Sequence, residues 1–99
     1  MLRCVRTLVT ENHLLSALCA LPDWSRSANH IHGTFTFPSF RHAIAFVNRV
    51  ADLSEEMDHH PEIEVHYTSV RLSLTTHSAG GLTMLDIEAA RRISQIHLA

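Results

Sequence analysis

The sequence predicts an α+β domain with three helices packed on one face of a four-stranded antiparallel sheet, in the order α-β-β-α-β-β-α. Apolar residues recur at helical spacing in three segments, and the two stretches between these segments show strand-like alternation. Each of these stretches contains a break where a turn can divide it into two strands. With 99 residues the chain is long enough for one core, so we expect a single domain over residues 9–99 and an N-terminal extension over residues 1–8.

The first expected helix follows Thr10 and ends before Pro22. Thr10 can cap this helix, and Glu11 in its first turn is favourable to the helix dipole. Apolar residues then recur at helical spacing at Leu14, Leu15, Leu18 and Leu21.

The first expected hairpin covers residues 24–37. Apolar residues and Gly33 occupy the odd positions from 31 to 37 and alternate with polar residues, as in a half-buried strand. Residues 24–27 can form the partner strand, with a turn near Ala28 and Asn29.

The second expected helix is long and begins after Pro38 and Ser39. Pro61 disfavours the α conformation at His60, so this helix should end between residues 58 and 60. Its predicted apolar face consists of Phe40, Ala43, Ile44, Val47, Val50, Ala51 and Met57.

The second expected hairpin follows Pro61. Apolar residues stand at odd positions up to Tyr67 and at even positions from Val70, so a turn at Thr68 and Ser69 should separate two strands. Residues 77–82 read as a loop, and Thr83 can cap a last helix with an acidic residue, Asp86, three positions later.

Composition excludes several classes of protein. The net charge of -2 and the pI near 6.5 argue against nucleic-acid binding, and no apolar stretch is long enough to span a membrane. Cys4 and Cys19 lack CxxC spacing, which favours a reducing compartment, and we expect a cytoplasmic protein.

The chain contains nine histidines, and three of them have a suggestive setting. His59 and His60 stand at the predicted helix end, and His77 follows the last predicted strand. Glu55 lies four residues before His59, so its carboxylate can orient that imidazole. The six others are expected to face solvent: His13, His30, His32, His42, His66 and His97.

Spacing alone leaves three interpretations of these histidines open: acid/base chemistry, a metal site and a structural role. Zinc needs three or four convergent ligands, and neighbouring residues on extended backbone point apart. His59 and His60 would therefore be an awkward chelating pair, and we expect no bound metal.

The pattern Glu55-x3-His59-His60-Pro61-x5-Tyr67-x9-His77-x8-Asp86 resembles the signature of the pterin-4a-carbinolamine dehydratases. The likeness extends from about residue 9 to residue 96. It implies the same fold that the pattern of elements predicts.

The resemblance also implies an activity: loss of water from a 4a-hydroxytetrahydropterin to give a quinonoid dihydropterin, without metal or organic cofactor. It implies that the three histidines line the pterin pocket. On this basis we assign proton transfer to His59 and His77, with Glu55 orienting His59. Binding of the pterin is assigned to His60, Asp58 and Pro61.

The expected partners also follow from the resemblance. They are the pterin substrate, a functional link to a pterin-dependent aromatic amino-acid hydroxylase through tetrahydrobiopterin recycling, and further copies of the chain in a homodimer or homotetramer. Two alternatives stay open. One is a non-catalytic pterin-binding or protein-dimerisation module, since animal members of the family also bind a transcription factor, and the other is a role in molybdopterin metabolism.

Overall fold

The computed structural model describes residues 7–98, and residues 1–6 and 99 lie outside that description. The elements follow the predicted order, with a short 3-10 helix, η2, inside the predicted loop. They are α1 (Glu11–Cys19), β1 (Trp24–Ser27), β2 (His30–Thr36), α2 (Phe40–Met57), β3 (Glu62–His66), β4 (Ser69–Leu74), η2 (His77–Ala79) and α3 (Met84–Leu98).

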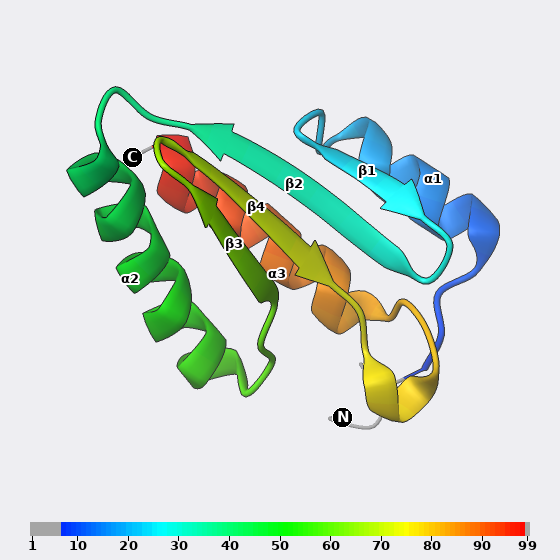
Figure 1. Cartoon of the computed structure of the whole chain (residues 1–99). Coiled ribbons are helices and arrows are strands. Elements are labelled where there is room, and N and C mark those ends of the chain that lie inside the picture. Colours follow the sequence, from blue (N-terminus) through cyan, green and yellow to red (C-terminus); the bar gives the residue numbers. More distant parts are fainter. Residues whose placement is uncertain (1–6, 99) are drawn as a thin grey trace.

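The four strands form one antiparallel sheet in the order β1-β2-β4-β3. Two hairpins, β1-β2 and β3-β4, are therefore joined through the pairing of the central strands β2 and β4. The three helices lie on one side of the sheet, and α3 crosses behind β3 and β4 in the view of Figure 1. The predicted fold class is confirmed.

The core lies between the sheet and the helices. Ile31, Phe35 and Leu72 are almost fully buried on the sheet side, and Val50 and Ile93 on the helix side. Burying a side chain of this size stabilises the fold by about 1.5–3 kcal/mol. These contacts hold α2 and α3 against the strands. They thereby position the end of α2 and the start of α3, where the candidate site lies.

The first hairpin needs a glycine where the Trp24 ring covers the sheet. A Cβ atom added at Gly33 would lie 2.9 Å from two atoms of that ring, and Trp24 and Gly33 are paired across β1 and β2. The indole N–H of Trp24 donates to Ser94 Oγ at 2.9 Å, which ties this hairpin to α3.

Helix α2 begins as predicted but presents a different face to the core. The side chain of Ser39 accepts a hydrogen bond from the backbone of His42, which caps the helix. The predicted apolar face was wrong in part, because Phe40 is 48% exposed while Phe46 and Leu53 are buried. Residues 43, 46, 50, 53 and 54 form the inward stripe. Of the predicted face, Phe40 and Ala51 are exposed, and sequence periodicity alone could not separate them from the inward residues.

The second hairpin turns one residue earlier than predicted. Tyr67 and Thr68 form the turn, since Ser69 is already paired with His66, and Tyr67 has the left-handed φ of 57°. The change of parity is nevertheless explained, because the turn brings Val65 opposite Val70, so that both side chains lie on the same face of the sheet.

The N-terminal segment contacts the domain before the predicted boundary at residue 9. Leu8 forms an isolated bridge with Thr83, and the backbone N–H of Val9 donates to Leu82 O at 3.0 Å. The rest of the predicted extension, residues 1–6, lies outside the described residues. No helix within residues 7–98 combines the length and the apolar character that crossing a membrane requires.

Candidate active site

The chain reverses direction at the end of α2, and this reversal separates the two adjacent histidines. Asp58 adopts the left-handed conformation with φ 51° and ψ 45°, and the backbone N–H of His59 then donates to Ser54 O at 3.0 Å. The side chain of His59 turns inward and is 9% exposed, whereas that of His60 is 53% exposed. The helix ends at Met57, one residue before the predicted range.

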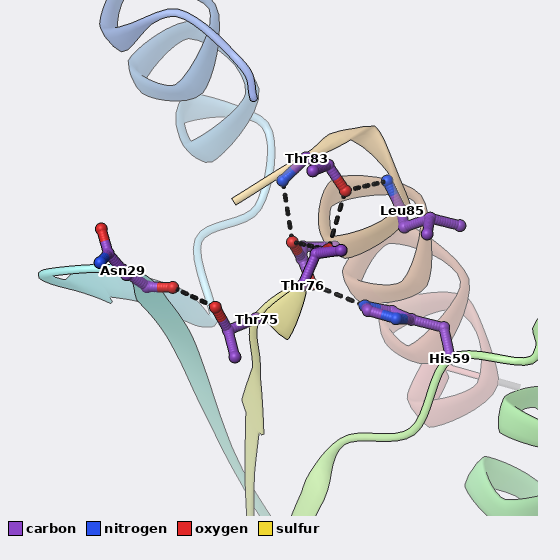
Figure 2. A network of polar contacts seen from close by, with 7 residues as sticks. Asn29, His59, Thr75, Thr76, Thr83 and Leu85 are labelled. Atoms are coloured by element: carbon purple, nitrogen blue, oxygen red, sulfur yellow. Dashed lines mark hydrogen bonds and ion pairs between the residues drawn. The ribbon is translucent and has the colours of Figure 1, made fainter. Parts of the chain in front are cut away.

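His59 contacts a carboxylate from the first turn of α3. Its Nε2 lies 2.6 Å from Oδ1 of Asp86, whose side chain is completely buried. The two residues are 27 positions apart in the sequence. Figure 2 shows His59 reaching from the segment after α2 toward the start of α3.

The second oxygen of Asp86 is also fully engaged. Thr76 Oγ1 donates to Asp86 Oδ2 at 2.8 Å, and the backbone N–H of Thr83 donates to the same oxygen at 2.9 Å. Asp86 therefore caps α3 as predicted and at the same time holds the imidazole of His59. Because this carboxylate also sits at a helix N-terminus, its negative charge is favoured there.

Hydroxyl groups extend this network (Figure 2). Thr76 uses its one hydroxyl proton on Asp86, so the 2.8 Å contact between Thr76 Oγ1 and Thr83 Oγ1 must be donated by Thr83. Thr83 Oγ1 in turn accepts from the backbone N–H of Leu85 at 3.2 Å. Each donor in this network is thus used once, and the orientation of the Asp86 carboxylate is determined.

This network assigns the tautomer of His59. An oxygen of an ionised carboxylate accepts hydrogen bonds, so the proton between His59 and Asp86 belongs to Nε2 of the imidazole. The other ring nitrogen, Nδ1, has no hydrogen-bond partner among residues 7–98 and is not sealed from solvent. His59 therefore has one anchored nitrogen and one nitrogen available for proton transfer.

His77 lies at the same end of the sheet. In the β3-β4 pairing Glu62 is opposite Ser73, so the residues that precede Glu62 run beside those that follow Ser73. Thr76, which holds Asp86, is the neighbour of His77 in the chain. A bridge between Thr76 and Gly81 closes the intervening loop, and the side chain of His77 is exposed on it.

The predicted partner of His59 was wrong. Glu55 does not orient His59: its carboxylate lies 2.6 Å from Nε2 of His60, on the surface. The spacing argument assumed a helix that continues through residue 59, but the left-handed residue Asp58 ends it and turns His59 the other way. Asp86 was part of the recognised signature, yet a contact over 27 positions gives no local signal.

The histidines expected to face solvent divide into two groups. His13, His42 and His66 are exposed as predicted, but His30, His32 and His97 are half-buried. His32 Nδ1 is buried without a hydrogen-bond partner, and burial together with Arg71 lowers the pKa of this imidazole. Within the described chain, no group of three or more His, Cys, Asp or Glu side chains is arranged to hold a metal ion.

Comparison with known proteins places this chain in a family. Residues 7–96 match the family model described as pterin 4 alpha carbinolamine dehydratase. A protein of Thermomicrobium roseum named "Putative pterin-4-alpha-carbinolamine dehydratase" is 47% identical over 83 residues, which cover 84% of this chain and 89% of that protein. A protein of the same name from Nocardia farcinica is 45% identical over 89 residues, covering 90% and 94%.

Two solved structures are also similar. The crystal structure of a transcriptional coactivator/pterin dehydratase from Brucella melitensis has a TM-score of 0.88 and 36% identity, and the match covers 92% of this chain and 99% of that one. A pterin dehydratase-like protein identified as a RuBisCO assembly factor in the alpha-carboxysome has a TM-score of 0.62 and 25% identity, with 75% and 86% covered. The fold is thus that of a pterin dehydratase-like α+β protein. The chain belongs to the pterin-4a-carbinolamine dehydratase family.

Proposed function

We propose that this protein catalyses the dehydration of a 4a-hydroxytetrahydropterin to a quinonoid dihydropterin. The observation that carries the proposal is the anchored imidazole of His59. Asp86 fixes its Nε2–H at 2.6 Å and leaves Nδ1 available at the end of the sheet where His60 and His77 are also located.

The reaction needs two proton transfers and no change of oxidation state. The bond between the ring carbon and the hydroxyl oxygen breaks, and the oxygen leaves as water after receiving a proton. A lone pair on the neighbouring ring nitrogen forms the new carbon–nitrogen double bond, and that nitrogen loses its proton. Imidazoles titrate near neutral pH and suit both transfers, each positioned group contributing about 10²–10⁴-fold.

The division of roles follows the surroundings of each side chain. We assign one proton transfer to Nδ1 of His59 and the other to the exposed imidazole of His77. Asp86 takes the orienting role first assigned to Glu55, because it holds His59 in one tautomer. Glu55 instead orients His60 at the surface, where His60, Asp58 and Pro61 are assigned to binding the pterin.

Recycling of tetrahydrobiopterin for an aromatic amino-acid hydroxylase is the physiological role that we propose for this activity. A non-catalytic role is the second candidate, and one finding favours it: the similar structure of the RuBisCO assembly factor. The complete set of His59, His60 and His77 supports catalysis, because a module that only binds a protein does not need an anchored imidazole.

We further propose that the protein forms a homodimer or homotetramer. Phe40, Val65 and Tyr67 are 48%, 38% and 75% exposed, and the rings of Phe40 and Tyr67 stack with centroids 6.5 Å apart. These side chains lie on α2 and at the β3 edge of the sheet, where unpaired backbone groups invite pairing with another copy. Size-exclusion chromatography with light scattering tests this, and a monomer at micromolar concentration would contradict it.

The activity is tested with enzymatically generated 4a-hydroxytetrahydropterin, whose dehydration is followed by absorbance. We expect the wild type to accelerate dehydration and the His59→Ala/His77→Ala double variant to lose the acceleration. A matched double variant, His13→Ala/His66→Ala, removes two exposed histidines outside the candidate site and should retain it. If the folded wild type gives no acceleration, the non-catalytic candidate replaces the dehydratase.

A further inference from the structure

A hollow of about 310 Å³ lies between the first half of α2, the last turn of α3 and the end of β2. Phe37, Phe46 and His97 form one wall, and His42 and Arg49 lie at its α2 side. Figure 1 shows the red end of α3 close to the start of α2. None of the residues assigned to the pterin reaction lines this hollow, which lies toward the opposite end of α2.

The wall of the hollow is built from packed rings. The Phe37 and Phe46 rings have centroids 5.0 Å apart, and the Phe37 and His97 rings meet edge to face at 5.4 Å. The ring of Phe35 is buried beneath them. Its centroid lies 4.8 Å from that of His97, which fixes the wall to the core. Rings held in this way offer an offset or edge-to-face partner to another planar ring.

Among residues 7–98, Arg49 is the charged side chain that lines the hollow, together with two histidines. No Asp or Glu lines it. Arg49 has no ion pair within residues 7–98, whereas Arg92 is paired with Glu56 and Arg91 with Glu88. An unpaired guanidinium beside an apolar wall is a good partner for a carboxylate, which it can bind through two parallel hydrogen bonds.

His42 adds a second donor on the same side. Its Nδ1 lies 2.6 Å from Ser39 Oγ, a residue that also caps α2, so the ring is held at the helix N-terminus. The other nitrogen, Nε2, has no hydrogen-bond partner in the described part of the chain. The neighbouring hollow shares Arg49 but contains Asp52 and Glu56, so its charges are mixed, unlike those of the aromatic hollow.

We propose that this aromatic hollow binds a small planar aromatic carboxylate. The ring lies against Phe37 and His97, and the carboxylate is bound by Arg49 with His42 beside it. The volume of about 310 Å³ stands at the lower end of the usual range for ligand sites, roughly 300–1,000 Å³, and suits a single ring with its substituent. The site is separate from the proposed pterin site and does not depend on the dehydratase activity.

The test uses benzoate as the probe and benzamide as its neutral counterpart. Binding to the full chain is measured by titration in ¹H–¹⁵N and aromatic ¹H–¹³C NMR spectra. We expect benzoate to shift the ring signals of Phe37 and His97 and benzamide to bind more weakly. Arg49→Gln should weaken benzoate binding by about tenfold or more, since it removes a charge-assisted bidentate contact, and should leave benzamide binding unchanged.

Arg41→Gln is the matched control. Arg41 is also on α2, is exposed and has no ion pair among the described residues, but it lines a different hollow. It should change benzoate binding by less than about twofold, since its side chain does not line the hollow and an exposed charge is screened by salt. Equal weakening by both arginine variants, shifts that map outside the hollow, or no benzoate binding at all would each overturn the proposal. Arg49→Gln should retain dehydratase activity, so the two proposals fail independently.

Discussion

Replacing Asp86 with asparagine keeps the shape of a buried side chain but replaces one of its hydrogen-bond acceptors with a donor. In the native protein both carboxylate oxygens accept hydrogen bonds, from His59 on one side and from Thr76 and Thr83 on the other. Asparagine has one oxygen and one NH₂ group. Its oxygen can serve the two donors at Thr76 and Thr83, so its NH₂ group faces Nε2 of His59.

This substitution inverts the tautomer of His59. An NH₂ group is a donor, so Nε2 must accept and the imidazole proton moves to Nδ1. The nitrogen that we assign to proton transfer then has no free lone pair. We expect the rate of dehydration to fall by about 10²–10⁴-fold, the contribution of one positioned acid/base group.

The stability should fall much less than the activity. Asp86→Asn exchanges charged for neutral hydrogen bonds in a shape that still fits, and we expect a loss of about 1–3 kcal/mol in the free energy of unfolding. Asp86→Ala leaves buried donors unpaired and should cost about 3–5 kcal/mol. Glu55→Gln is the surface control. Its pair with His60 has side chains 78% and 53% exposed, so it should cost at most about 1 kcal/mol.

The assay combines the dehydration rate, urea unfolding and ¹⁵N NMR of the histidine rings, which distinguishes the two tautomers. A folded Asp86→Asn protein with wild-type activity would refute the role of Asp86. A large loss of activity with the Nε2–H tautomer retained would instead show that Asp86 acts by another route.

Three further predictions concern other parts of the fold. Burial, the larger cause, and the charge of Arg71 lower the pKa of His32 from its ordinary value of 6.5. On acidification the imidazole is therefore protonated in the unfolded chain before it is protonated in the folded one. Stability should therefore decline as the pH falls below about 6.5, and His32→Gln should flatten that part of the decline in urea titrations at several pH values. Gly33→Ala should lower the free energy of unfolding by about 1–3 kcal/mol through overpacking against Trp24, and a stability equal to the wild type would contradict the close approach. Asp58→Gly should raise stability by roughly 0.5–1 kcal/mol because glycine adopts the left-handed conformation more easily, while a simultaneous rise in KM would support a role of Asp58 in pterin binding.

Features that depend on nearby residues could be predicted from the sequence. Thr10 and Ser39 cap their helices through contacts over three positions, and Asp86 bonds back to Thr83 over the same distance. Such contacts are formed within one helical turn, so a short motif contains all the information that they require.

The partner of His59 could not be predicted in this way. The contact with Asp86 depends on the left-handed turn at Asp58, on the β3-β4 register and on the position of α3 over the sheet. Helical spacing favoured Glu55, because it cannot say where a helix stops to within one residue. The inward face of α2 was predicted only in part for a related reason, since packing and not periodicity decides which apolar residues turn inward.

The double role of Asp86 changes which substitutions the start of α3 can accept. In an ordinary capping box the side chain at the third helical position only satisfies the backbone N–H of the N-cap residue. Here Asp86, three positions after Thr83, also determines the tautomer of His59, which lies 27 positions away in the sequence. An exchange that lowers the stability only moderately can therefore remove most of the proposed activity, and the opening of one helical turn would do the same transiently. Hydrogen exchange at the amides of Thr83 and Leu85 accordingly measures how often this turn opens.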